Sequence, residues 1–140
     1  ARTASGTFNL TNGTLKATAI QRGPQTGNAT AVTVAFNWAT GTIQNADAAD
    51  LTITNVPITL TAGTHTFVAS GTQTITLTNS AIGGAGQGIV KSGPGTLALN
   101  TANTYTGTTE VSAGTLRLGV GGAKPAASPV ALGGGTLAVA

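Results

Sequence analysis

The chain has 140 residues, of which 40% are hydrophobic and only 6% are charged, and its formal net charge is +3. This length fits one domain with a core of its own, and the six basic residues are scattered without interleaved aromatics, which argues against binding to nucleic acid. There is no cysteine, so disulfides and thiolate metal sites are excluded, and no apolar run approaches the roughly 18 residues that span a bilayer.

Short β-strands are predicted along the chain, because apolar residues alternate with small or polar ones and helical periodicity is absent. The first forty residues are the least regular, since 21–28 is predicted to be an inserted loop and the Phe36-Asn37-Trp38 cluster has no counterpart. The alternating pairs that follow, in chain order, are Leu51 and Ile53, Ile58 and Leu60, Ile75 and Leu77, Leu97 and Leu99, Leu116 and Leu118, and Leu137 and Val139. The sequence therefore predicts an all-β protein.

A ladder of apolar residues, each preceded by threonine, recurs at intervals near 20 residues. Its members are Leu15, Val34, Ile53, Ile75, Leu97, Leu116 and Leu137. A period of this length without helices predicts a β-solenoid, in which each repeat is one coil and the ladder residues stack inward as a continuous core. We expect one solenoid domain over 1–140 with about seven coils, irregular over 1–40 and regular over 41–140.

A distinct motif occupies residues 88–119, GIVKSGPGTLALNTANTYTGTTEVSAGTLRLG. Its characteristic residues are Lys91, Gly93, Gly95, Thr96, Leu97, Asn103, Tyr105, Gly107, Gly114, Thr115 and Leu116. In order and spacing they resemble the autotransporter-associated β-strand repeat of bacterial autotransporter passenger regions. That resemblance implies a right-handed parallel β-helix, extracellular or on the bacterial cell surface, commonly in stalks or adhesins, and it implies no catalytic residue. Thr108 follows Gly107 where the family often carries a second glycine.

Candidate catalytic groups are few. His65 is the only histidine, and a Ser-His-Asp set could be assembled only with Ser70 and Asp47 or Asp50, without a nucleophile elbow. We expect His65 to face outward from a strand. Lys91 and Ser92 are adjacent strand residues and therefore point to opposite faces, so they do not form a Ser-Lys pair.

The three acidic residues are Asp47, Asp50 and Glu110. Glycoside hydrolysis requires two carboxylates that flank the bond, and a calcium-dependent reaction requires several around the ion. Asp47 and Asp50 share a loop, where a solvated turn is favoured over a weak calcium site. We expect no enzyme, no cofactor and no metal, with a glycan-active β-helix enzyme as a minor alternative.

Two further patterns suggest ligands. Tyr105 and Trp38 could stack on sugars, although we favour a Tyr105 that caps the core at a corner and an Asn103 that closes an Asx-type turn. The Thr-x-Thr units of the strands suggest ice binding as a minor alternative. Ala98, Arg117 and Ala138 interrupt any flat threonine array.

Both ends of the chain carry strand patterns rather than polar caps, and an open strand edge is a template for further pairing. The predicted end-stacking interface consists of Thr7, Phe8, Leu10, Leu137 and Val139. We expect a secreted, non-enzymatic structural protein that stacks end to end into a stalk or filament, or one tile of a longer repeat chain. The alternative is an adhesive passenger segment that binds a glycan or another surface ligand.

Overall fold

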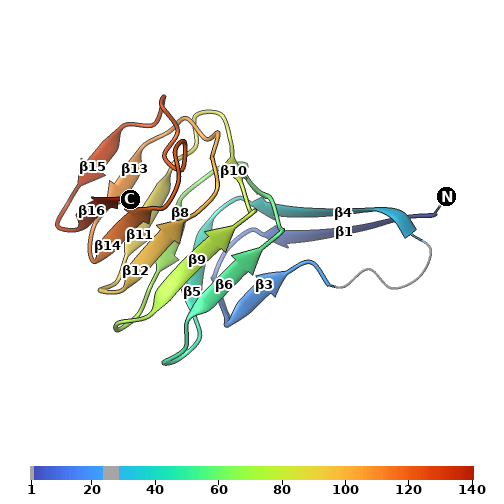
Figure 1. Ribbon diagram of the computed structural model, residues 1–140, viewed down its shortest axis with the longest axis horizontal. Helices are drawn as coiled ribbons and strands as arrows, with labels where there is room; N and C mark the ends of the chain where they lie inside the picture. The colour runs from blue at the N-terminus through green and yellow to red at the C-terminus, as the bar shows by residue number, and fades with distance from the viewer. Residues whose placement is uncertain (1, 24–28) are drawn as a thin grey trace.

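The computed structural model describes residues 2–23 and 29–140 and contains three sheets in which all strand pairs are parallel (Figure 1). Sheet A comprises β1 (Arg2–Leu10), β4 (Ala29–Trp38), β7 (Ile58–Leu60) and β10 (Ile82–Gly83). Sheet B comprises β2 (Thr14–Ala17), β5 (Gly41–Asn45), β8 (His65–Val68), β11 (Ile89–Ser92), β13 (Thr109–Val111) and β15 (Val130–Leu132). Sheet C comprises β3 (Ala19–Gln21), β6 (Leu51–Thr54), β9 (Thr74–Thr78), β12 (Thr96–Leu99), β14 (Thr115–Leu118) and β16 (Thr136–Val139).

From β1 to β12 the chain visits sheets A, B and C in turn and repeats this circuit, and from β13 to β16 it visits only sheets B and C. Each circuit is one coil of a parallel β-solenoid. This confirms the predicted fold class. Within the described ranges no helix is long or apolar enough to cross a membrane.

The predicted number of seven coils is wrong: the solenoid has about five turns with a period near 24 residues. The first coils are longer than the predicted period, since Leu15 pairs with Ile43, 28 residues on (43 − 15), and Ile20 pairs with Ile53, 33 residues on (53 − 20). Two members of the predicted ladder do not lie on sheet C with the other five. Leu15 belongs to sheet B and Val34 to sheet A.

The core of sheet C consists of two columns of inward side chains, each residue above its register partner in the next coil. One column runs through Leu51, Ile75, Leu97, Leu116 and Leu137, and the other through Ile20, Ile53, Leu77, Leu99, Leu118 and Val139. Ile53 thus stands beside Leu77 and not Ile75, where the predicted ladder put it. Full burial of an aliphatic side chain contributes about 1.5–3 kcal/mol. The fully buried members, from Leu51 to Leu116 and from Ile53 to Leu99, therefore supply much of the stability.

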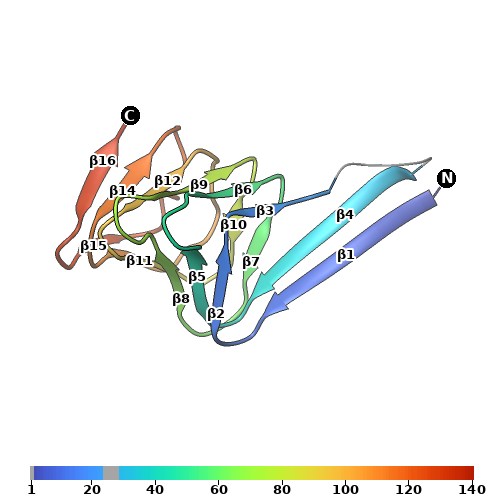
Figure 2. The ribbon, with the colours of Figure 1, turned by 90° about the horizontal axis from the view of Figure 1, so that it is seen from below.

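The N-terminal part departs from the regular solenoid. β1 and β4 are the longest strands, and they project beyond the coils as a two-stranded ribbon (Figures 1 and 2). β7 pairs with β4 only at Phe36, Asn37 and Trp38. Of the predicted loop at 21–28, Gln21 is the last residue of β3, and 24–28 lie outside the described residues.

Candidate functional site

Lys91 is the most unusual side chain of the core. It stands in the inward column of sheet B between Phe67 of β8 and Val111 of β13, and it is fully buried. The alternation Ile89-Val90-Lys91 explains this position, because residues two apart on a strand share a face. The aliphatic stem of the lysine therefore takes the place of a core side chain.

The Lys91 ammonium group is bound by the corner between sheets B and C. Nζ donates hydrogen bonds to the carbonyl oxygens of Ser92 at 2.7 Å, Gly93 at 2.7 Å and Ala113 at 3.1 Å. Because an ammonium group has three donors, all of them are satisfied. Burial lowers the pKa of Lys91 to about 8, so the side chain is protonated at neutral pH. Its contacts hold two successive coils together at this corner.

Gly114 shows why the motif requires glycine beside this lysine. Its φ is +67°, and an added Cβ would lie 2.8 Å from Lys91 Nζ and would collide with the carbonyl oxygens of Gly93 and Gly95. Any side chain here would displace the backbone that binds the ammonium group.

Asn103 performs a similar role at the corner that leads out of sheet C. Its Oδ1 accepts a hydrogen bond from the Ile82 backbone N–H at 2.7 Å, and its Nδ2 donates to the carbonyl oxygens of Thr101 and Ala123. Ile82 belongs to the preceding coil and Ala123 to the following one. The predicted Asx-type turn is therefore wrong, because this amide bridges three coils.

Tyr105 lies fully buried within the same corner region. Its hydroxyl is hydrogen-bonded to Thr109 Oγ1 at 2.7 Å, which is bonded in turn to Ser128 Oγ at 2.8 Å. Ser128 Oγ also contacts the carbonyl oxygen of Gly107 at 2.7 Å. Burial raises the pKa of Tyr105, so the ring stays neutral in this chain of hydroxyls.

His65 is 1% exposed, so the predicted outward orientation is wrong. Nε2 lies 2.9 Å from the carbonyl oxygen of Trp38, and Nδ1 lies 3.0 Å from that of Gly88. The edge-on rings of Trp38 and Phe67, 5.0 Å apart, complete the cluster. Because Trp38 belongs to the preceding coil and Gly88 to the following one, His65 also bridges three coils.

The structure does not bring a nucleophilic triad together. Ser70 Oγ accepts a hydrogen bond from Gln44 Nε2, and both ring nitrogens of His65 face backbone carbonyl oxygens. Lys91 Nζ contacts the Ser92 carbonyl oxygen and not its hydroxyl.

Of the three carboxylates, Asp47 and Asp50 share one turn and Glu110 lies on β13. Asp50 accepts a hydrogen bond from the Thr74 backbone N–H, and Glu110 accepts one from Ser112 Oγ. The turn that contains Asp47 and Asp50 is tied by Asn45, whose Nδ2 donates to the carbonyl oxygens of Asp47 and Ala49. Across residues 2–23 and 29–140 there is no group of three side chains suited to hold a metal ion.

The predicted sugar-stacking side chains are inaccessible, since Tyr105 and Trp38 are fully buried. The outward threonines of β6 and β9 do not continue into a flat array. Thr52 and Thr76 stand in one register column with Ala98, Arg117 and Ala138.

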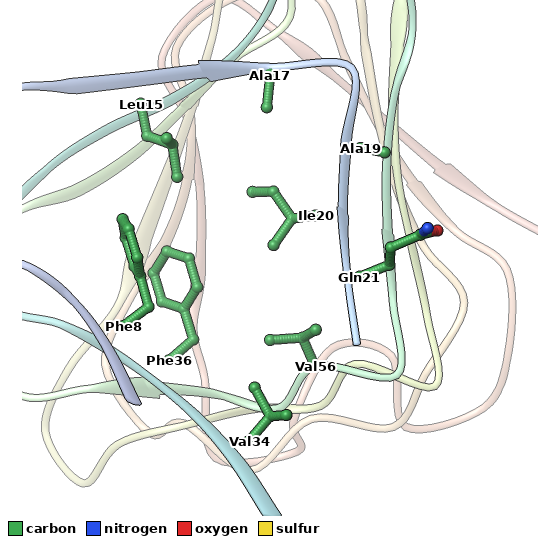
Figure 3. Close-up of a pocket in the computed structure, with 9 residues that line it drawn as sticks. All are labelled: Phe8, Leu15, Ala17, Ala19, Ile20, Gln21, Val34, Phe36 and Val56. Carbon is green, nitrogen blue, oxygen red and sulfur yellow. The ribbon is translucent and has the colours of Figure 1, made fainter. Parts of the chain in front are cut away.

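A cavity of about 310 Å³ lies in the first coil, at the root of the ribbon (Figure 3). It is lined by Phe8, Leu15, Ala17, Ala19, Ile20, Gln21, Val34, Phe36 and Val56. The inward column that contains Leu51 has no apolar member in the first coil. Ala19 pairs with Thr52, so the residue opposite Leu51 is Thr18. The lining is apolar apart from Gln21 and carries no charged group.

Several buried polar side chains were not anticipated, among them Asn45, His65, Ser80, Thr109 and Ser128. The burial of Lys91 could have been predicted, because Lys91 is two residues from Ile89 and so shares its inward face of the strand. For the others the chain gives little warning, because threonine, serine and asparagine are common on every face.

The buried network thus consists of a lysine, amides, hydroxyls and an imidazole that bind backbone groups of neighbouring coils, which is an arrangement suited to hold coils together. No curated protein and no solved structure matches the chain. Residues 89–118, which span β11 to β14 with the Lys91, Asn103 and Tyr105 corners, match the passenger-associated-transport-repeat family.

Proposed function

We propose that this chain is a structural, non-enzymatic segment of an exported passenger region, where the solenoid acts as a rod on or outside a bacterial cell. The observation that carries the proposal is the passenger-repeat match at 89–118. The matched residues form coils of the solenoid itself, stacked between β8–β9 on one side and β15–β16 on the other, which supports a role for the rod.

The use of the reactive side chains supports a non-enzymatic role. Lys91, Tyr105 and His65 are all buried and hydrogen-bonded to their own chain. General acid–base chemistry requires a group that can reach a substrate. The exposed carboxylates are Asp47 and Asp50 in one turn and Glu110 on β13.

Localisation is the first test. Intact cells of the source organism are treated with a protease and then probed with an antibody against β8–β14, with a cytoplasmic protein as the control. We expect the rod to be cleaved or labelled on intact cells, or recovered from the medium. Recovery only from lysed cells would overturn the proposal.

We further propose that the two ends of the rod associate, so that the partner of one copy is a second copy. The inward column of sheet B runs from Leu15 to Leu132, and the second inward column of sheet C runs from Ile20 to Val139. Since all strands are parallel, a translation along the axis sets Leu132 against Leu15 and Val139 against Ile20. Leu132 is 57% and Val139 73% exposed.

The structure changes which of the predicted end-stacking residues we include in this interface. Phe8 is 45% exposed and available, whereas Leu10 is 7% exposed and belongs to the core. Negative-stain microscopy of the purified chain should show rods longer than one unit, and V139K should shorten them. Single units for the wild type would count against self-stacking.

A further inference from the structure

The ribbon has an edge that nothing in the described chain covers. In sheet A, β4 lies between β1 and β7, but β7 reaches only Phe36, Asn37 and Trp38. Over residues 29–35 the side of β4 that faces away from β1 has no neighbouring strand (Figures 1 and 2). The unpaired backbone of this stretch is a template for an added strand.

The composition of β4 favours such pairing. Its sequence, ATAVTVAFNW, contains no charged residue, no proline and no glycine. Charged residues and proline are among the devices by which edge strands usually prevent association. Uncharged segments of β-branched and aromatic residues pair readily with copies of themselves.

We propose that β4 pairs with β4 of a second copy, antiparallel across a two-fold axis near Thr33, to give a continuous four-stranded sheet. A two-fold axis places the same surface of each copy against the other. Thr33 then faces Thr33, and Val32 faces Val34. Thr–Thr and β-branched pairs of this kind stabilise antiparallel pairing, and no like charges oppose one another.

The ribbon itself gives a reason for the second copy. An isolated two-stranded sheet is marginal in water, and three or more strands are needed for independent stability. Val34 and Phe36 also line the cavity at the root of the ribbon, so the ribbon carries apolar side chains on its inner face. Pairing across the two-fold axis extends that face. This lateral dimer is independent of the end-to-end association proposed above.

The test uses the V139K background, in which end stacking is weakened. Thr33 is exposed at the open edge of β4, and Thr59 is equally an exposed threonine of sheet A but lies on β7 between β4 and β10. Sedimentation equilibrium at about 100 µM, a concentration that populates weak complexes, compares T33K with T59K. We expect a dimer for the background and for T59K, and loss of the dimer for T33K.

Cross-linking gives a second readout, because the chain contains no cysteine. Under mild oxidation T33C should form a disulfide-linked dimer that a reducing agent dissociates, whereas T59C should remain monomeric. A monomeric background protein, a dimer that persists in T33K, or equal cross-linking of T33C and T59C would each overturn the proposal.

Discussion

The coils from β8 to β14 and the N-terminal part formed by β1 to β4 are built from similar residues, but they complete their cores differently. In the regular coils polar side chains such as Lys91 and Asn103 bind backbone groups of neighbouring coils. In the N-terminal part the first coil contains a cavity of about 310 Å³, and β4 has an open edge. Apolar columns are present in both regions, so bridging at the corners is what distinguishes the closed coils from the open one.

The largest effect is expected for Asn103→Ala. The change removes both hydrogen-bonding groups of the amide and leaves the buried Ile82 N–H without its acceptor, at a cost of about 2–4 kcal/mol in the free energy of unfolding. Asn12→Ala is the control, because Asn12 is exposed and, within residues 2–23 and 29–140, its side chain accepts a hydrogen bond from the adjacent Gly13 N–H alone. Urea denaturation measures both. Equal losses in the two variants would show that bridging between coils is unimportant.

Gly114→Ala should destabilise the protein by about 3 kcal/mol, from the left-handed backbone and the collision with the carbonyl oxygens around Lys91. Gly13→Ala provides a matched control in the N-terminal part. Gly13 has a φ of +86° but no atom within 4 Å of an added Cβ. Gly13→Ala should lower the free energy of unfolding only by the backbone strain, about 1–2 kcal/mol. The difference between the two variants therefore measures the collision of a Cβ at position 114 with the carbonyl oxygens around Lys91.

Lys91→Met tests the buried ammonium group through pH. The pKa of Lys91 is about 8 in the folded chain and 10.5 in the reference state. Between these values the unfolded chain binds the proton that the folded chain has lost, so wild-type stability rises with pH over this window. We expect wild type to gain on the order of 1 kcal/mol relative to K91M from pH 8 to pH 10. If the free energies of unfolding of wild type and K91M changed equally with pH, the lowered pKa of Lys91 would be contradicted.

The smallest effect is expected for filling the cavity. Ala17→Val should stabilise the first coil by about 0.5–1 kcal/mol, since the added methyl groups enter apolar space. The same change at Ala69, which is fully buried in a closed coil, should instead destabilise by about 1 kcal/mol or more through overpacking. Thermal unfolding of the two variants compares the two regions. A lower melting temperature for both variants would show that the cavity cannot accept the added methyl groups.

The period-2 alternation was sufficient to predict the all-β class, and the repeat was sufficient to predict a solenoid. Neither could fix the number of coils. Threonine precedes an apolar residue on all three sheets, so Leu15, Val34 and Ile53 fitted one ladder although they lie on sheets B, A and C.

The site was less predictable, because burial of a polar group depends on partners distant in the sequence. His65 meets carbonyl oxygens of Trp38 and Gly88, 27 and 23 residues away. No local pattern marks such a histidine as internal. The motif residues were recognisable as a set, but the role of Asn103 as a bridge between coils required the register.

The fluorescence of Trp38 reports on the boundary between the two regions. Trp38 is the only tryptophan, it ends β4, it is fully buried, and its indole N–H has no hydrogen-bond partner among the described residues. Its fluorescence should be blue-shifted while the ribbon joins the coils and should move to longer wavelength when water enters there. Tyr105, deep in the regular coils, reports by absorbance on the other region, so the two halves can be followed separately in a single unlabelled sample.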